Sequence, residues 1–254
     1  MVKSISLESF NNLKQSHGYK LPLKFNSIDD ELTILGLLSI LNFGSGYRLM
    51  FHHYTGRGAF DNIKRFILGL YLNKDNGCLE TNFMINFNLD NAIDYVGFSP
   101  FEEKPHPTLP GVIVGERDAV AVEFLQLLTD TINEIGNVLK KSNKLSFGHY
   151  LRELFESTSD VNKIIDIVSA LYFSFEYHSS NQLRQLTKDF NTLDDKHCFK
   201  LNNGSSVEIK LYKKCLILIE TIRLHFKERG QDLSFNLPNV DNVLLPIFSD
   251  NVRL

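Results

Sequence analysis

Residues 29–41 constrain the fold more than any other segment, because as a helix they carry apolar side chains on nearly every side. Asp29 and Asp30 open the segment, and acidic residues are favoured in the first turn of a helix by the positive end of its dipole. A helix that is apolar on all sides is buried among other elements. The sequence therefore predicts a central helix over residues 30–43, stopped by Gly44, Ser45 and Gly46. Its apolar positions include Leu32, Leu35, Leu38, Ile40 and Leu41.

The same helical spacing of apolar residues recurs along most of the chain. It predicts a mainly α fold, with residues 1–28 as an N-terminal arm and residues 29–254 as a single all-helical domain. Within that domain we expect further helices at residues 59–72, 118–141, 146–157, 160–175 and 208–229.

Three intervening segments lack this period. Residues 73–88 could hold a short extended piece. Residues 102–111 contain three prolines and predict a loop, because proline disrupts helices and sheet ladders. Residues 179–206 are polar and predict irregular structure, with a turn at Asn202-Asn203-Gly204.

Composition narrows the function classes. The net charge of the 254-residue chain is −3, which argues against a general nucleic-acid binder, although one small phosphate pocket is compatible with it. The three cysteines are far apart and form no zinc or disulfide pattern. No secretory signal is read at the N-terminus, and the longest apolar runs fall short of the ~20 residues that span a bilayer. We expect a cytoplasmic protein, with the nucleus as an alternative, and neither a membrane nor a stable nucleic-acid partner.

Two glycine-rich stretches have two interpretations. Residues 44–48 (GSGYR) and 55–60 (TGRGAF) adjoin predicted helix ends, where glycine commonly supplies a left-handed cap. Alternatively, Arg48, Arg57 and the N-terminus of the helix at 59–72 could form an anion pocket together with His52 and His53. Adjacent histidines point in different directions, so His52 and His53 favour a surface position over a metal site. Asp241 stands in an apolar context, either as a functional buried carboxylate or as a helix cap.

Five short stretches, in this order, resemble the queuosine-salvage protein family. They are LNF at 41–43, NEIG at 133–136, YFSFEY at 172–177, VEIKLYKKCLILI at 207–219 and DNVLLP at 241–246. The resemblance covers roughly residues 30–250. It implies an all-helical fold related to the helix-hairpin-helix DNA glycosylases, and hydrolysis of queuosine 5′-phosphate to release queuine, with no metal or other cofactor.

The resemblance also implies roles for individual residues. Asp241 would support the positive charge that develops on the ribose, as in other glycoside hydrolysis. Lys213 would bind phosphate or pair with that carboxylate, and Tyr212 precedes it in the same substrate-binding motif. Phe43 would stack on the base and Asn42 would hydrogen-bond its edge. One extra residue separates Asp241 from Pro246, so Asn242 is an alternative occupant of the catalytic position.

Further departures from the family pattern include Leu216 for glutamine and Glu176-Tyr177 for Arg-Asp. They leave two alternatives to an active enzyme that takes a small nucleoside 5′-monophosphate. One is a catalytically impaired relative that still binds a nucleotide or base. The other is a helical interaction protein.

Overall fold

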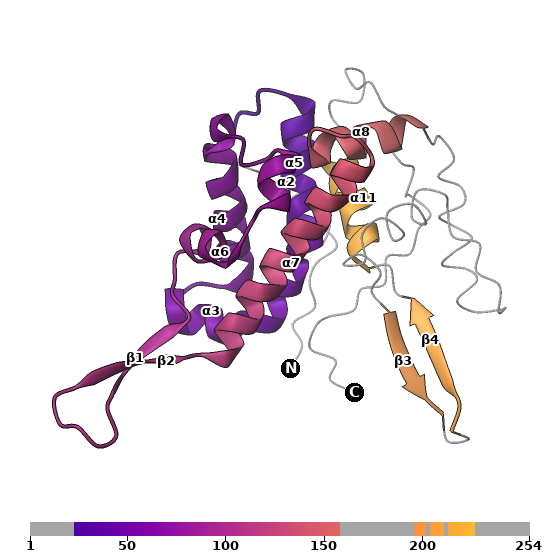
Figure 1. Ribbon diagram of the computed structural model, residues 1–254. Helices are drawn as coiled ribbons and strands as arrows, with labels where there is room; N and C mark the ends of the chain where they lie inside the picture. The colour runs from indigo at the N-terminus through magenta and orange to yellow at the C-terminus, as the bar shows by residue number, and fades with distance from the viewer. Residues whose placement is uncertain (1–22, 158–195, 202–203, 211–212, 227–254) are drawn as a thin grey trace, which may run out of the picture.

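The computed structural model describes residues 23–157, 196–201, 204–210 and 213–226, and the structural statements below refer to these residues. The fold is mainly α-helical, with two short β-hairpins beside the helices (Figure 1). The α-helices are α2 (Ile28–Ile40), α3 (Arg48–Thr55), α4 (Ala59–Leu72), α5 (Thr81–Ile85), α6 (Leu89–Val96), α7 (Ala119–Lys141), α8 (Phe147–Ser157) and α11 (Lys213–Phe226). Two 3₁₀ helices are η1 (Leu41–Tyr47) and η2 (Lys74–Asn76), and the strands are β1 (Phe101–Pro105), β2 (Ile113–Arg117), β3 (Lys196–Lys200) and β4 (Ser206–Lys210).

Helix α2 lies at the centre, as its apolar surface predicts. Ser27 caps its N-terminus by accepting a hydrogen bond from the backbone of Asp30, and every residue from Glu31 to Ile40 is buried. It packs against α4, α8 and α11. Burial of large apolar side chains stabilises a fold by roughly 1.5–3 kcal/mol each, so this one helix anchors much of the core.

Glycine brings α2 and α8 unusually close together. The backbone N–H of Gly148 donates to Thr33 Oγ1 at 2.8 Å, and that hydroxyl in turn donates to the carbonyl of Asp29 at 2.8 Å. A Cβ atom on Gly148 would overlap the Asp29 carbonyl, and one on Gly36 would lie 2.6 Å from the Phe147 ring. Both positions therefore require a residue without a side chain.

The NEIG segment has a structural role within α7. The Asn133 amide donates to the backbone carbonyls of Met84, Ile85 and Phe87 at 2.9, 3.1 and 2.8 Å. The Met84 and Ile85 carbonyls end α5, and that of Phe87 lies two residues beyond it; carbonyls that a helix C-terminus leaves unsatisfied need such donors. A Cβ on Gly136 would lie 2.5 Å from the Ile85 nitrogen, so glycine allows α5 to lie directly on α7.

Four helix predictions are confirmed within one to three residues: the central helix, 59–72, 118–141 and 146–157. The expected stop at Gly44–Gly46 is wrong, because the chain continues as η1 and then α3. Gly44 instead permits close contact with α4, where a Cβ would lie 2.8 Å from Ile63. Within residues 73–88, η2 and α5 take up most of the segment, and the expected extended piece is confined to Glu80, which is extended and forms an antiparallel β-bridge with Ser146. The predicted helix at 160–175 and the YFSFEY segment lie outside the described residues.

The prediction of a loop at residues 102–111 is wrong for its first part. Strand β1 pairs antiparallel with β2, from Phe101 opposite Arg117 to Pro105 opposite Ile113. Proline is tolerated at the end of a strand in a two-stranded ribbon, because one strand edge needs no ladder partner. The helix predicted from residue 208 begins only at Lys213, since β4 pairs with β3 up to Lys210.

The last part of the expected N-terminal arm contacts the helical core. Leu23 and Phe25, in the last part of the predicted arm, pack against the core, and Phe25 contacts Tyr71 edge-on.

Within the described part, the helical run Ile28–Thr55 is long and apolar enough to cross a bilayer, with a mean hydropathy of 1.3. Of that run's apolar window, 61% is buried inside the fold, which is also how a core helix behaves.

The α2–α8 contact predicts a marked effect of Gly148→Ala. The added methyl has no room, so we expect the free energy of unfolding to fall by about 1–3 kcal/mol or more, as overpacked cores do. Gly46→Ala is the matched control, because nothing lies within 4 Å of its added Cβ, and a change below about 1 kcal/mol is expected. Urea denaturation measures both, and equal stability of the two variants would contradict the close helix contact.

Candidate functional site

The candidate site begins at η1, which carries Asn42 and Phe43 beyond the end of α2. The Phe43 ring is half-buried and lies 6.3 Å from the Phe124 ring of α7, measured between centroids. Tyr47, one turn further along η1, contacts the same Phe124 at 5.2 Å. Phe124 is fully buried, so it holds both rings of η1 against α7.

A cation from the other end of the sequence meets this aromatic group. Lys214 Nζ lies 5.7 Å from the centroid of the Phe43 ring, within the range of a cation–π contact. Lys214 is the second residue of α11 and follows Lys213, with which that helix begins. The structure thus brings the LNF segment and the start of the lysine-containing helix together.

The Asn42 side chain, one residue before Phe43 on η1, has hydrogen-bonding capacity of its own. It is half-buried, and its amide makes no hydrogen bond to any residue in the described part of the chain. Its backbone carbonyl accepts from the Ser45 hydroxyl at 3.3 Å, which ties down the turn of η1. An amide offers two N–H donors and one carbonyl acceptor, which suits the edge of a heterocyclic base.

The two candidate arginines are not part of one cluster. Arg48 begins α3 and Arg57 follows its end, so the eight-residue helix separates them by about 12 Å along its axis. Both side chains are exposed, and neither makes an ion pair with a described residue. Arg48 is continuous with η1, whereas Arg57 lies at the N-terminus of α4.

The turn around Arg57 is organised by glycine and by a buried asparagine. Gly56 is left-handed, with a φ of 66°, and ends α3, which confirms the capping interpretation for this stretch. The Asn62 amide donates to Thr55 Oγ1 and to the carbonyls of Arg57 and Gly58 at 3.0, 3.4 and 2.9 Å. Asn62 is 2% exposed, and sequence reasoning did not identify it.

The two histidines do not form a metal site with other described residues. His53 Nε2 lies 2.9 Å from Glu102 Oε1, within hydrogen-bond distance at the base of the β1–β2 hairpin, and His52 is exposed. Among the described residues, no group of three or more His, Cys, Asp or Glu side chains could hold a metal ion.

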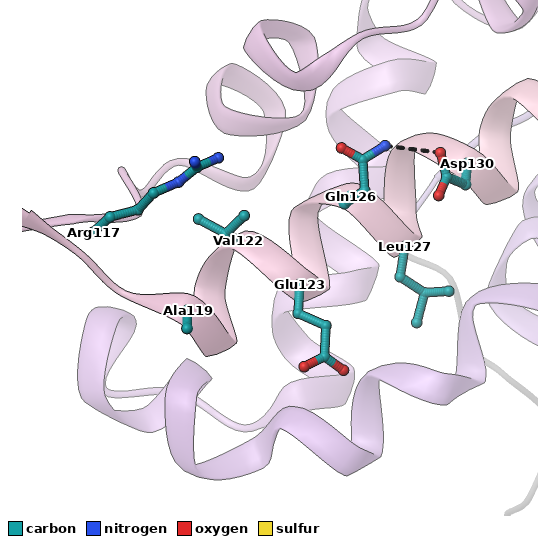
Figure 2. A pocket seen from close by; sticks show the side chains of 7 residues that line it. All are labelled: Arg117, Ala119, Val122, Glu123, Gln126, Leu127 and Asp130. Carbon is teal, nitrogen blue, oxygen red and sulfur yellow. Dashed lines mark hydrogen bonds between the residues drawn. The ribbon is translucent and has the colours of Figure 1, made fainter.

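A shallow hollow of about 590 Å³ runs beside the candidate site, along the first turns of α7. Figure 2 shows Arg117 extending from the end of β2 beside this helix, and Gln126 bonded to Asp130 one turn further on. Glu123 also lines the hollow and accepts a hydrogen bond from the Tyr47 hydroxyl at 2.8 Å. Two carboxylates in its lining make the hollow a poor place for a phosphate. Its lining residues are Arg117, Ala119, Val122, Glu123, Gln126, Leu127 and Asp130.

The remaining predicted site residues lie outside what the structure describes. Asp241, Asn242 and Tyr212 fall beyond the described residues, and for Lys213 only the backbone is described. Phe124 and Lys214 belong to the site but were absent from the sequence prediction. The sequence holds one signal for Lys214, which is the doubled lysine of the YKK segment.

Comparisons with protein-family models, curated proteins and solved structures find no match to this chain.

Contact with Glu123 predicts an unusual titration of Tyr47. Burial, the hydrogen bond to Glu123 and the nearby negative charge together raise the Tyr47 pKa from 10.0 to about 12. A raised pKa contributes stability that is present below pH 10 and is lost as the pH rises through about 12. The phenolate absorbance of the wild type minus that of Tyr47→Phe isolates this group among the nine tyrosines. Glu123→Gln should lower the pKa towards 10, and an unchanged value would contradict the contact.

Proposed function

We propose that the protein is an N-glycosidase that acts on a modified nucleoside 5′-monophosphate, with queuosine 5′-phosphate as the substrate. The proposal rests on the resemblance of five ordered segments to the queuosine-salvage family. It implies a helical fold related to the helix-hairpin-helix DNA glycosylases. The structural observation that supports it most directly is the 5.7 Å contact between Lys214 Nζ and the Phe43 ring.

This contact supplies two of the chemical groups that such a ligand needs. A flat deazapurine gains about 1–3 kcal/mol by stacking on an aromatic ring, and Phe43 offers a half-buried one. A 5′-phosphate needs a cation close to the base-binding ring, and Lys214 occupies that position. The Asn42 amide, on the same 3₁₀ helix, is available to read the base edge.

In this proposal Asp241 is the catalytic carboxylate. Breaking an N-glycosidic bond builds positive charge on the ribose, and a carboxylate beneath the sugar stabilises that charge or activates water. The bond electrons pass to the base, which leaves with a proton, and the hydroxyl of water takes its place on the ribose. Lys213 or its neighbour Lys214 would hold the phosphate during this step. The reaction needs no oxidant, reductant or metal.

Incubation of the full chain with queuosine 5′-phosphate, followed by mass spectrometry for free queuine, tests the proposal. We expect product from the wild type and a loss of about 10²–10⁴-fold in turnover for Asp241→Asn, with an unchanged melting temperature. Asp130→Asn removes an exposed carboxylate of the α7 hollow and should leave turnover intact.

A second pair of variants tests the binding ring. Phe43→Leu keeps apolar contact with Phe124 but removes the aromatic face, and should weaken binding of free queuine about tenfold or more. Phe83→Leu is its control, because this half-buried phenylalanine contacts Phe87 and Tyr95 instead. Binding without any product would contradict the enzyme proposal and favour a catalytically impaired relative. Absence of both binding and product would favour a helical interaction protein.

A further inference from the structure

The β1–β2 hairpin extends away from the helices of the described part of the chain (Figure 1). Every residue of β2 is exposed, and in β1 only Glu102 is partly covered. An isolated two-stranded hairpin is marginally stable in water, because it can bury little of its own surface. This hairpin therefore presents two open faces.

One face, which we call the charged face, is satisfied by its own ion pairs. It carries Glu102, Lys104, Val114 and Glu116, since residues directly across an antiparallel pair share a face. Lys104 Nζ lies 2.7 Å from Glu116 and 3.6 Å from Glu102, and Glu102 also pairs with His53. The contact between Glu102 and His53 ties the base of the hairpin to α3.

The opposite face, which we call the apolar face, exposes large apolar side chains and has charged side chains without ion pairs to described residues. It carries Phe101, Glu103, Pro105, Ile113, Gly115 and Arg117. The Phe101 side chain is 55% exposed and that of Ile113 is 64% exposed. Glu103 and Arg117 have opposite charges, and neither makes an ion pair with a residue in the described ranges. Gly115 leaves a shallow space beside Phe101, to which a Cβ would come within 3.8 Å.

We propose that the apolar faces of two copies of this chain pack against each other around a two-fold axis. A two-fold interface places the same patch on both subunits, so the patch has to be complementary to itself. The apolar face meets this condition, because Glu103 of one copy can pair with Arg117 of the other while Phe101 and Ile113 cover each other. Three acidic and two basic residues on the two strands give the hairpin an acidic excess, which does not suit nucleic acid or an anionic membrane.

The size of the face predicts the strength of the dimer. A standard interface uses roughly 20–30 residues per side, and a single hairpin supplies fewer. We therefore expect a weak, concentration-dependent dimer that is monomeric when dilute.

Sedimentation velocity of the full chain from about 1 to 100 µM tests the proposal, since a weak interface has a dissociation constant in the micromolar range. The wild type should shift from monomer to dimer across this range. Glu103→Arg and Arg117→Glu should each move the transition at least tenfold higher, and the double variant should restore it, because both intersubunit pairs are rebuilt in reverse. Ile113→Asp should also remove the dimer.

Leu145→Asp is the matched control, because Leu145 is 77% exposed but lies before α8, away from the hairpin. Circular dichroism of each variant checks its folding, and the charge exchange decides the matter even if Ile113→Asp unfolds. A wild type that stays monomeric would overturn the proposal and leave the face to a different partner. A double variant that does not recover the dimer, or an equal loss in Leu145→Asp, would also overturn it.

Discussion

At the start of α2, three consecutive acidic residues each contact a basic side chain from a different element. The Asp29 carboxylate takes two hydrogen bonds from Arg152 of α8, at 2.7 and 3.2 Å. Asp30 binds Lys74 of η2 at 2.7 Å, and Glu31 binds His225 of α11 at 2.6 Å. The side chains of Glu31 and His225 are only 6% and 16% exposed. Removing one partner of such a buried pair typically costs about 3–5 kcal/mol, whereas exposed pairs contribute about 1 kcal/mol or less.

The Glu31–His225 pair is one of the contacts that hold α11 against the central helix. Near the C-terminal end of α11, His225 meets the first turn of α2, while Lys214 at its beginning meets Phe43 beyond the last turn of α2. The two segments therefore run antiparallel, and buried side chains of α11 fill the space between these two contacts. Holding one end of α11 fixes the place of the other. The candidate site at Phe43 thus depends on a contact at the opposite end of the same helix. Among the α11 side chains that the structure describes, the buried ones are Leu218, Ile219, Thr221, Ile222 and Phe226.

The helical spacing of apolar residues predicted the long helices, because each of these helices buries one or more faces against the core. That spacing could not predict the β1–β2 hairpin, whose strands and loop contain three prolines and several charges, and whose exposed strands lack alternation with a buried face. The same spacing placed residues 208–210 in a helix, because they continue the apolar pattern of α11 in the sequence, whereas they form the end of β4. Asn42 and Phe43 were identified only through a resemblance. The proximity of Phe43 to Lys214 is a long-range contact that no local pattern encodes. Gly44 and Asn133 both act through tertiary packing. Local propensity therefore predicted a helix stop at Gly44, which is wrong, and does not explain why Asn133 is where it is.

An NMR titration tests whether the junction of η1 and α11 binds the nucleotide, as we propose. Backbone and side-chain amide signals of the isotope-labelled full chain would be followed as queuosine 5′-phosphate is added. We expect the largest shifts at the Asn42 amide, at Phe43 and at Lys214, with little change at Val122 and Gln126 in the α7 hollow. Shifts confined to the hollow, or no shift at millimolar ligand, would contradict it.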